Sequence, residues 1–180
     1  MKAMTGRSLV AAGLISVGLM TGARAAAATE TATAATEIAV IGLHFDNTSP
    51  EPTRPDEVER MKLVNAQLAD RLAASPRYRI VPITPEIADK IADGPQVGNC
   101  TGCQLDYAKA LGARLVAWGN VQKVSNLILN INVYIEDVET GQRTFVHSVD
   151  IRGNDDRSWT KGMAYLINNH LLADESRRSN

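Results

Sequence analysis

Cys100 and Cys103 form a C-x-x-C motif and are the only two cysteines in a chain of 180 residues. In an exported protein, two cysteines predict a disulfide. A C-x-x-C just before a helix is also where thiol oxidoreductases hold their pair, because a helix N-terminus lowers a thiol pKa. Metal binding is a third interpretation. No strand precedes the motif and no aromatic or Pro-His residues surround it, so the structural disulfide is favoured. Gln104 stands where covalent haem attachment would require histidine.

The three histidines, His44, His147 and His170, are scattered along the sequence. His44 and Asp46 share a face near the end of a predicted strand, where open α/β sheets tend to place ligands. Zinc would require three or four ligands, so a strand-end histidine bonded to a neighbour is the favoured interpretation. We therefore expect no metal and no cofactor.

No recognised catalytic motif is present. The sequence has no glycine-rich phosphate loop, no G-x-S-x-G and no H-E-x-x-H. We expect no catalytic residues and no enzymatic activity.

The remaining candidate is a surface on two neighbouring strands. Side chains at alternate positions of a strand share one face. Paired across a hairpin, three positions on each strand would form a patch of amides flanked by two aromatic residues. An ordinary solvated face, or amides bonded beneath a helix, would give the same pattern. The predicted patch consists of Trp118, Asn120, Gln122, Asn130, Asn132 and Tyr134.

Only a regular sheet would hold these residues side by side. The sequence from Arg114 to Gly153 predicts such a sheet, because it has the pattern of three strands in series. The alternating apolar positions in its middle are typical of a strand with one apolar and one polar face. Two short turns, over 123–126 and 137–142, predict antiparallel hairpins. The apolar positions are Leu127, Leu129, Ile131, Val133 and Ile135.

The other predicted elements alternate between strands and helices. Strands are predicted over 37–47, buried on both faces, and over 77–83. Helices are predicted from a capping box at 53–56 to about residue 74, from Thr84 to about 92, over 105–111, and from a cap at Asn154 or Asp155. The order β-α-β-α-α-β-β-β-α predicts an α/β (α+β) fold with a single mixed sheet of about five strands.

The N-terminal residues predict export. A positive segment, the apolar run 9–20 and the small residues Ala23 and Ala25 form a signal peptide over 1–25. A flexible leader (26–36), a single globular domain (37–174) and a disordered tail (175–180) are predicted to follow. A dozen apolar residues are too few to span a bilayer, so no stable membrane insertion is expected.

Charge and composition argue against nucleic acid as a partner. Cleavage would remove three of the 19 basic residues and none of the 20 acidic ones, which leaves a net charge of about −4. A nucleic-acid-binding protein would favour a basic face. The aromatic content of 4% is also low for a surface that stacks bases or sugars.

Three segments resemble the amino-terminal domain of the TolB protein and the curli-secretion lipoprotein family. They are 38–49 (IAVIGLHFDNTS), 110–119 (ALGARLVAWG) and 133–141 (VYIEDVETG). Two others, 122–130 (QKVSNLILN) and 148–154 (SVDIRGN), are similar to an uncharacterised family of secreted bacterial proteins, known only as a domain of unknown function.

The TolB resemblance implies a periplasmic module that works through contacts with another envelope protein, without catalysis. The chain departs from that pattern because it lacks a propeller and a lipid-bearing cysteine and adds the C-x-x-C. The prediction is a periplasmic or secreted, non-enzymatic binding or accessory protein. The alternative is a thiol–disulfide or metal-handling protein centred on Cys100 and Cys103.

Overall fold

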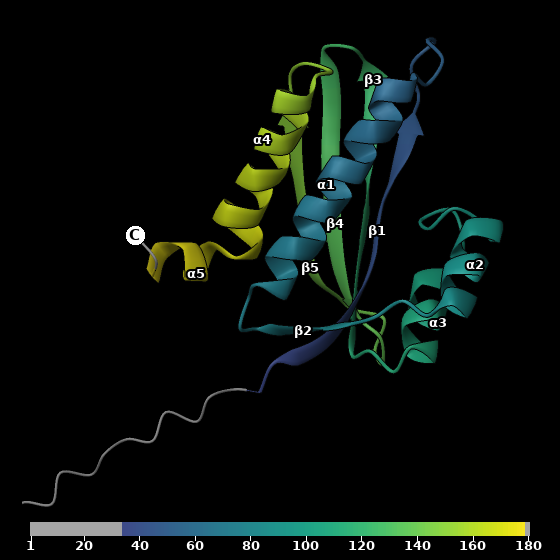
Figure 1. Cartoon of the computed structure of the whole chain (residues 1–180), viewed down its shortest axis with the longest axis vertical. Coiled ribbons are helices and arrows are strands. Elements are labelled where there is room, and N and C mark those ends of the chain that lie inside the picture. Colours follow the sequence, from purple (N-terminus) through teal and green to yellow (C-terminus); the bar gives the residue numbers. More distant parts are fainter. Residues whose placement is uncertain (1–33, 179–180) are drawn as a thin grey trace, which may run out of the picture. The chain divides into compact units, whose positions relative to one another are not determined.

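The computed structural model describes residues 34–178, which form one mixed sheet with helices packed against it (Figure 1). The strand order is β2-β1-β3-β4-β5. β1 pairs in parallel with β2 and β3, whereas β3, β4 and β5 pair as consecutive antiparallel hairpins. The strands are β1 (Thr36–Asn47), β2 (Tyr78–Val81), β3 (Leu115–Ser125), β4 (Ile128–Asp137) and β5 (Arg143–Ile151).

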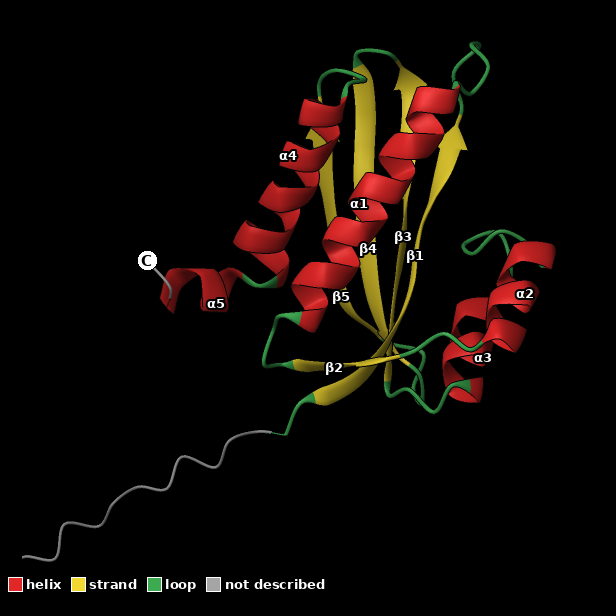
Figure 2. Ribbon diagram, in the orientation of Figure 1, coloured by secondary structure: helices red, strands yellow, loops and turns green. Residues whose placement is uncertain are grey.

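Helices fill the connections between the parallel strands and follow the last strand. Figure 2 shows α1 and α4 lying across one face of the sheet, whereas α2 and α3 lie next to each other beyond β1 in this view. The predicted element order and the single five-stranded mixed sheet are confirmed. The helices are α1 (Pro55–Ala73), α2 (Pro85–Asp93), α3 (Cys103–Ala110), α4 (Asp156–Leu166), the π-helix η1 (Ile167–Leu171) and α5 (Ala173–Arg178).

Two apolar cores lie on opposite sides of the sheet. The larger core packs α1 and α4 against the sheet and contains fully buried residues such as Leu68 and Met163. Burial of each such side chain contributes roughly 1.5–3 kcal/mol. The smaller core gathers Ala108 of α3 with Val116 and Trp118 of β3. Successive residues of β1, Ile38 and Ala39, enter the two cores, which confirms that this strand is buried on both faces.

A β-bulge in β1 decides which residues of its second half face each core. The pairing of β1 with β3 shifts between Val40 and Gly42, and Gly42 has a φ of +93°. An extra residue in one strand reverses the alternation of side chains beyond it. As a result Leu43 joins the larger core, and His44 and Asp46 face the opposite side.

The starts of α2 and α4 agree with the sequence, whereas α3 begins at Cys103 instead of Leu105 and the cap of α1 is displaced by one residue. Asp155 caps α4 by accepting a hydrogen bond from the Ser158 backbone, as predicted. The box at α1 was predicted over 53–56, but Arg54 is the cap residue, and its backbone N–H donates to Glu57 Oε2 at 2.8 Å. Pro55 occupies the first helical position, where its missing N–H costs nothing.

Two other predicted boundaries are also wrong. The β3–β4 turn falls at 126–127, not at 123–126, so Leu127 lies in the turn, 72% exposed, instead of on the apolar face of a strand. The tail expected over 175–180 begins inside α5. The predicted signal peptide and most of the predicted leader lie outside the described residues. No helix within 34–178 combines the length and apolar character that crossing a membrane requires.

Candidate interaction surface

Two rows of polar side chains cross four neighbouring strands on the face opposite α1 and α4. The strand register places His44, Asn120, Asn132 and Ser148 side by side in the first row. It places Asp46, Gln122, Asn130 and Asp150 side by side in the second. We call these eight residues the amide face.

The register confirms the predicted pairing across the β3–β4 hairpin. Trp118 lies opposite Tyr134, Asn120 opposite Asn132 and Gln122 opposite Asn130, and these pairs share one face. The sequence did not show that β1 and β5 extend the rows. Alternation along β5 already places Ser148 and Asp150 together, but only the pairing of β5 with β4 aligns them with the amides.

Hydrogen bonds hold part of the amide face in place. Asn132 Nδ2 donates to Asn120 Oδ1 at 2.8 Å, and Asn130 Nδ2 donates to Asp150 Oδ1 at 2.7 Å. Ser148 Oγ donates to Asn130 Oδ1 at 2.8 Å. Within residues 34–178 the Gln122 side chain makes no such bond. The face is therefore preorganised and still has donors and acceptors for a partner.

Trp118 is buried, so the prediction that it forms part of a surface patch is wrong. It is only 5% exposed, and its ring centroid lies 4.6 Å from that of Tyr134, which is half-buried. The Arg143 guanidinium lies over both rings, 4.7 Å from the Tyr134 centroid and 5.6 Å from that of Trp118. The two aromatic residues border the amide face, but only Tyr134 is accessible.

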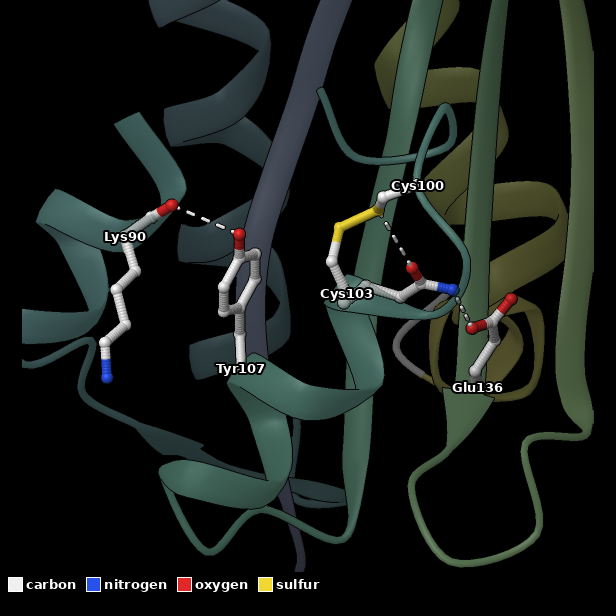
Figure 3. The surroundings of a disulfide bond; sticks show 6 residues. Lys90, Cys100, Cys103, Tyr107 and Glu136 are labelled. Carbon is white, nitrogen blue, oxygen red and sulfur yellow. Dashed lines mark hydrogen bonds between the residues drawn. A yellow bond between two sulfur atoms is a disulfide. The ribbon is translucent and has the colours of Figure 1, made fainter. Parts of the chain in front are cut away.

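Cys100 and Cys103 form a disulfide, as predicted, and their Cα atoms are 5.8 Å apart. Cys103 is the first residue of α3. Figure 3 shows the disulfide and Glu136 in the same region. Gln104 connects them, because its Oε1 lies 4.0 Å from Cys100 Sγ and its Nε2 donates to Glu136 Oε2 at 2.8 Å. Glu136 Oε1 in turn accepts a hydrogen bond from Arg143 Nε at 2.9 Å. The disulfide is therefore linked, residue by residue, to the aromatic border of the amide face.

His44 lies at the margin between the amide face and the smaller core. Burial lowers the pKa of its imidazole, and the neighbouring Asp46 carboxylate offsets part of that effect. At neutral pH the ring is therefore uncharged. A neutral imidazole presents one donor and one acceptor nitrogen.

His147 and His170, far apart in sequence, stack on one another with ring centroids 3.4 Å apart. They come from β5 and η1 and lie on the side of the sheet that α4 covers. Burial, with a smaller contribution from His170, lowers the pKa of His147. Among the described residues no three His, Cys, Asp or Glu side chains gather in an arrangement that could hold a metal ion.

Comparison with known proteins gives one family and several similar structures. A family model described as "Protein of unknown function (DUF2380)" matches residues 36–171, which include all five strands. No curated protein matches the chain.

Three of the similar solved structures illustrate the range of likeness. The LpoB C-terminal domain from Salmonella enterica gives a TM-score of 0.49 at 14% identity, over 68% of this chain and 87% of that one. Lipoprotein GNA1162 from Neisseria meningitidis gives a TM-score of 0.48 at 16% identity, over 81% of this chain and 97% of that one. TolB from Acinetobacter baumannii gives a TM-score of 0.38 at 14% identity, over 73% of this chain and 28% of that one. All these TM-scores are below 0.5, so the function proposed below rests on this chain's own residues.

Proposed function

The chain belongs to the family described as "Protein of unknown function (DUF2380)", in agreement with its resemblance to an uncharacterised family, and we propose its function from the amide face. The protein is a non-enzymatic binding or accessory protein of the periplasm or of the secreted fraction. It acts by contacting another envelope protein through the amide face.

The two cross-strand rows are the observation that carries this proposal. Eight hydrogen-bonding side chains lie on four strands of one sheet, with Tyr134 at their border. Interfaces favour aromatic anchors surrounded by polar groups that hydrogen-bond to the partner. A sheet positions such groups more rigidly than a loop, so little conformational entropy is lost on binding.

A change at the centre of the amide face tests the proposal. Gln122→Lys places a charge between Asp46 and Asn130 and breaks no hydrogen bond described here, so the fold should survive. We expect affinity for the partner to fall by at least about tenfold, about 1.4 kcal/mol, because the lysine would pair with Asp46 and remove both side chains from hydrogen bonding to the partner. Partners recovered from a periplasmic extract with the wild-type protein would be quantified by mass spectrometry, then remeasured with the purified pair.

The matched control is Gln142→Lys, the same change at an exposed position in the β4–β5 turn, away from the face. It should leave the affinity unchanged. A partner bound equally well by the wild type and by Gln122→Lys would show that the amide face is not the interface.

The thiol alternative has one observation in its favour. Cys103 begins α3, and a helix N-terminus lowers a thiol pKa. Gln104 connects the same site to Glu136, whose negative charge opposes a thiolate. A thiol oxidoreductase would reduce or oxidise a model disulfide substrate catalytically, whereas we expect this protein to show no turnover in that assay.

A further inference from the structure

Two buried nitrogen atoms beside the amide face have no hydrogen-bond partner. Within the described residues neither Trp118 Nε1 nor His44 Nδ1 is paired, although both atoms are shielded from solvent. Buried polar groups in folded proteins are nearly always satisfied, so each exception requires an explanation. Since an indole N–H can only donate, its natural partner is an acceptor oxygen.

The segment that covers both rings is the loop over residues 94–102, between α2 and α3. At Gly98, whose φ is +96°, a Cβ would lie 3.1 Å from Trp118 Cζ3 and 3.6 Å from His44 Cε1. The loop backbone at Gly98 therefore lies against the benzene half of the Trp118 indole and against the Cε1 atom that adjoins His44 Nδ1. Val97 is buried in the same apolar core as Trp118.

The loop is attached at both ends. At Gly94 a Cβ would lie 2.6 Å from Tyr107 Oη, and that hydroxyl donates to the Lys90 carbonyl at 3.1 Å. At the other end the disulfide joins Cys100 to the first residue of α3 (Figure 3). Between these ends its backbone bonds are local, such as that from Asn99 N to Gln96 O at 2.9 Å.

We propose that the 94–102 loop is a lid, held closed by the Cys100–Cys103 disulfide, over a binding site for an acceptor oxygen. The donors are Trp118 Nε1–H and His44 Nδ1–H, in the neutral tautomer that carries its proton on Nδ1. The Arg143 guanidinium over the Trp118 ring favours a carboxylate. When the lid opens, the Trp118 ring becomes accessible and adds a second aromatic anchor to the border of the amide face. This inference deepens the proposed function: the oxygen belongs to an acidic side chain or chain end of the envelope protein that the face binds.

Hydrogen exchange of the full mature chain tests the lid. Dithiothreitol breaks the Sγ–Sγ bond, supplies two electrons and two protons to give two thiols, and is itself oxidised to a cyclic disulfide. After reduction we expect amides of 94–102 to exchange at least about tenfold faster, while those of α1 keep their rates. Cys100→Ser with Cys103→Ser should reproduce the effect without reductant. Unchanged exchange of 94–102 in fully reduced protein would overturn the lid.

Acetate, as a minimal carboxylate, tests the site without the partner. In a proton–nitrogen NMR spectrum we expect the Trp118 indole N–H signal of reduced protein to shift saturably with acetate and not with equal chloride. The Trp159 indole donates to Asn154 Oδ1 at 3.1 Å and is the internal control. Trp118→Phe assigns the signal. A lid that opens without an acetate-dependent shift would overturn the binding site.

These two measurements are independent of the proposed function. If Gln122→Lys retains the partner, the amide face is not the interface, whatever the lid does. If Gln122→Lys loses the partner but reduction changes neither loop exchange nor the indole signal, the interface stands and the lid is wrong.

Discussion

Glu57 and Lys123 form an ion pair in which both side chains are fully buried. Lys123 Nζ lies 2.8 Å from Glu57 Oε1, and Asn154 also donates to that oxygen. Glu57 Oε2 accepts from the Arg54 backbone. The pair thus connects the start of α1, the end of β3 and the loop before α4. Among the described residues, removal of Glu57 would leave the buried Lys123 ammonium with only the longer contact to Glu51 Oε2, at 3.4 Å.

We predict that Glu57→Gln lowers the free energy of unfolding by about 3–5 kcal/mol, the usual cost of breaking a buried ion pair from one side. Urea denaturation measures it. The control is Glu59→Gln on the same helix, which removes an exposed pair with Lys62 and should cost less than about 1 kcal/mol. Replacing both partners, with Glu57→Gln and Lys123→Met, should recover part of the loss.

The same carboxylate gives the stability a pH dependence. Burial raises the pKa of Glu57, but hydrogen bonds from Lys123, the Arg54 backbone and Asn154 together lower it below its ordinary value. The unfolded chain therefore takes up this proton first, so the stabilisation is complete above about pH 4.3 and is lost as the pH falls further. Identical acid sensitivity in the wild type and in Glu57→Gln would contradict this assignment.

At the scale of elements, α1 protects a strand edge that β2 leaves uncovered. β2 pairs with β1 only from Thr36 to Ala39, so the rest of β1 has an open edge. Asn65 of α1 bonds to this edge as another strand would: its Oδ1 accepts from Leu43 N at 2.6 Å and its Nδ2 donates to Leu43 O at 3.0 Å. Gly42 leaves room for the amide, because a Cβ there would lie 2.9 Å from Asn65 Oδ1.

We predict that Asn65→Ala lowers the free energy of unfolding by about 1–3 kcal/mol, since it leaves two backbone groups of Leu43 unsatisfied. Thermal and urea unfolding measure the change. Asn169→Ala is the matched control, because its side-chain amide donates to the Tyr165 carbonyl at an exposed position of η1. Equal effects from the two variants would show that Asn65 does not protect the edge.

The elements were predictable where a repeating pattern specifies them. Alternation along β3 and β4 is a property of the local chain, and it correctly placed Asn120 beside Asn132 and Gln122 beside Asn130. The bulge before Gly42 could not be foreseen, because it becomes visible only when β1 is paired with β3. Because the bulge was not predicted, the sequence could not show that His44 aligns with Asn120.

Burial and charge pairing were the least predictable features. Trp118 has the spacing of an exposed strand residue, but a loop about 20 residues earlier in the sequence covers it. Glu57 was recognisable as part of a helix start, but its partner Lys123 lay in a predicted turn. Both cases depend on contacts between segments far apart in the sequence, and no local pattern reports those.

At the scale of the whole sheet, its two edges differ. The β1–β2 edge combines a four-residue strand, a following proline, a bulge and the Asn65 amide. Such features discourage an added strand from another molecule. β5 is a nine-residue edge strand without proline, in unbroken register with β4 from Leu129 to Ile135. Intermolecular strand pairing, where it occurs, is therefore favoured at β5.

The position of β1 between β2 and β3 also bears on the order in which the sheet folds. β3, β4 and β5 are joined by short turns, so their pairing is local and forms early. β1 pairs with β3 through residues such as Ile38 and Leu115, which are far apart in the sequence. Contacts so distant along the chain form slowly. The apolar start of β1 therefore stays exposed until β3 is in place, and it needs shielding by chaperones in the interval.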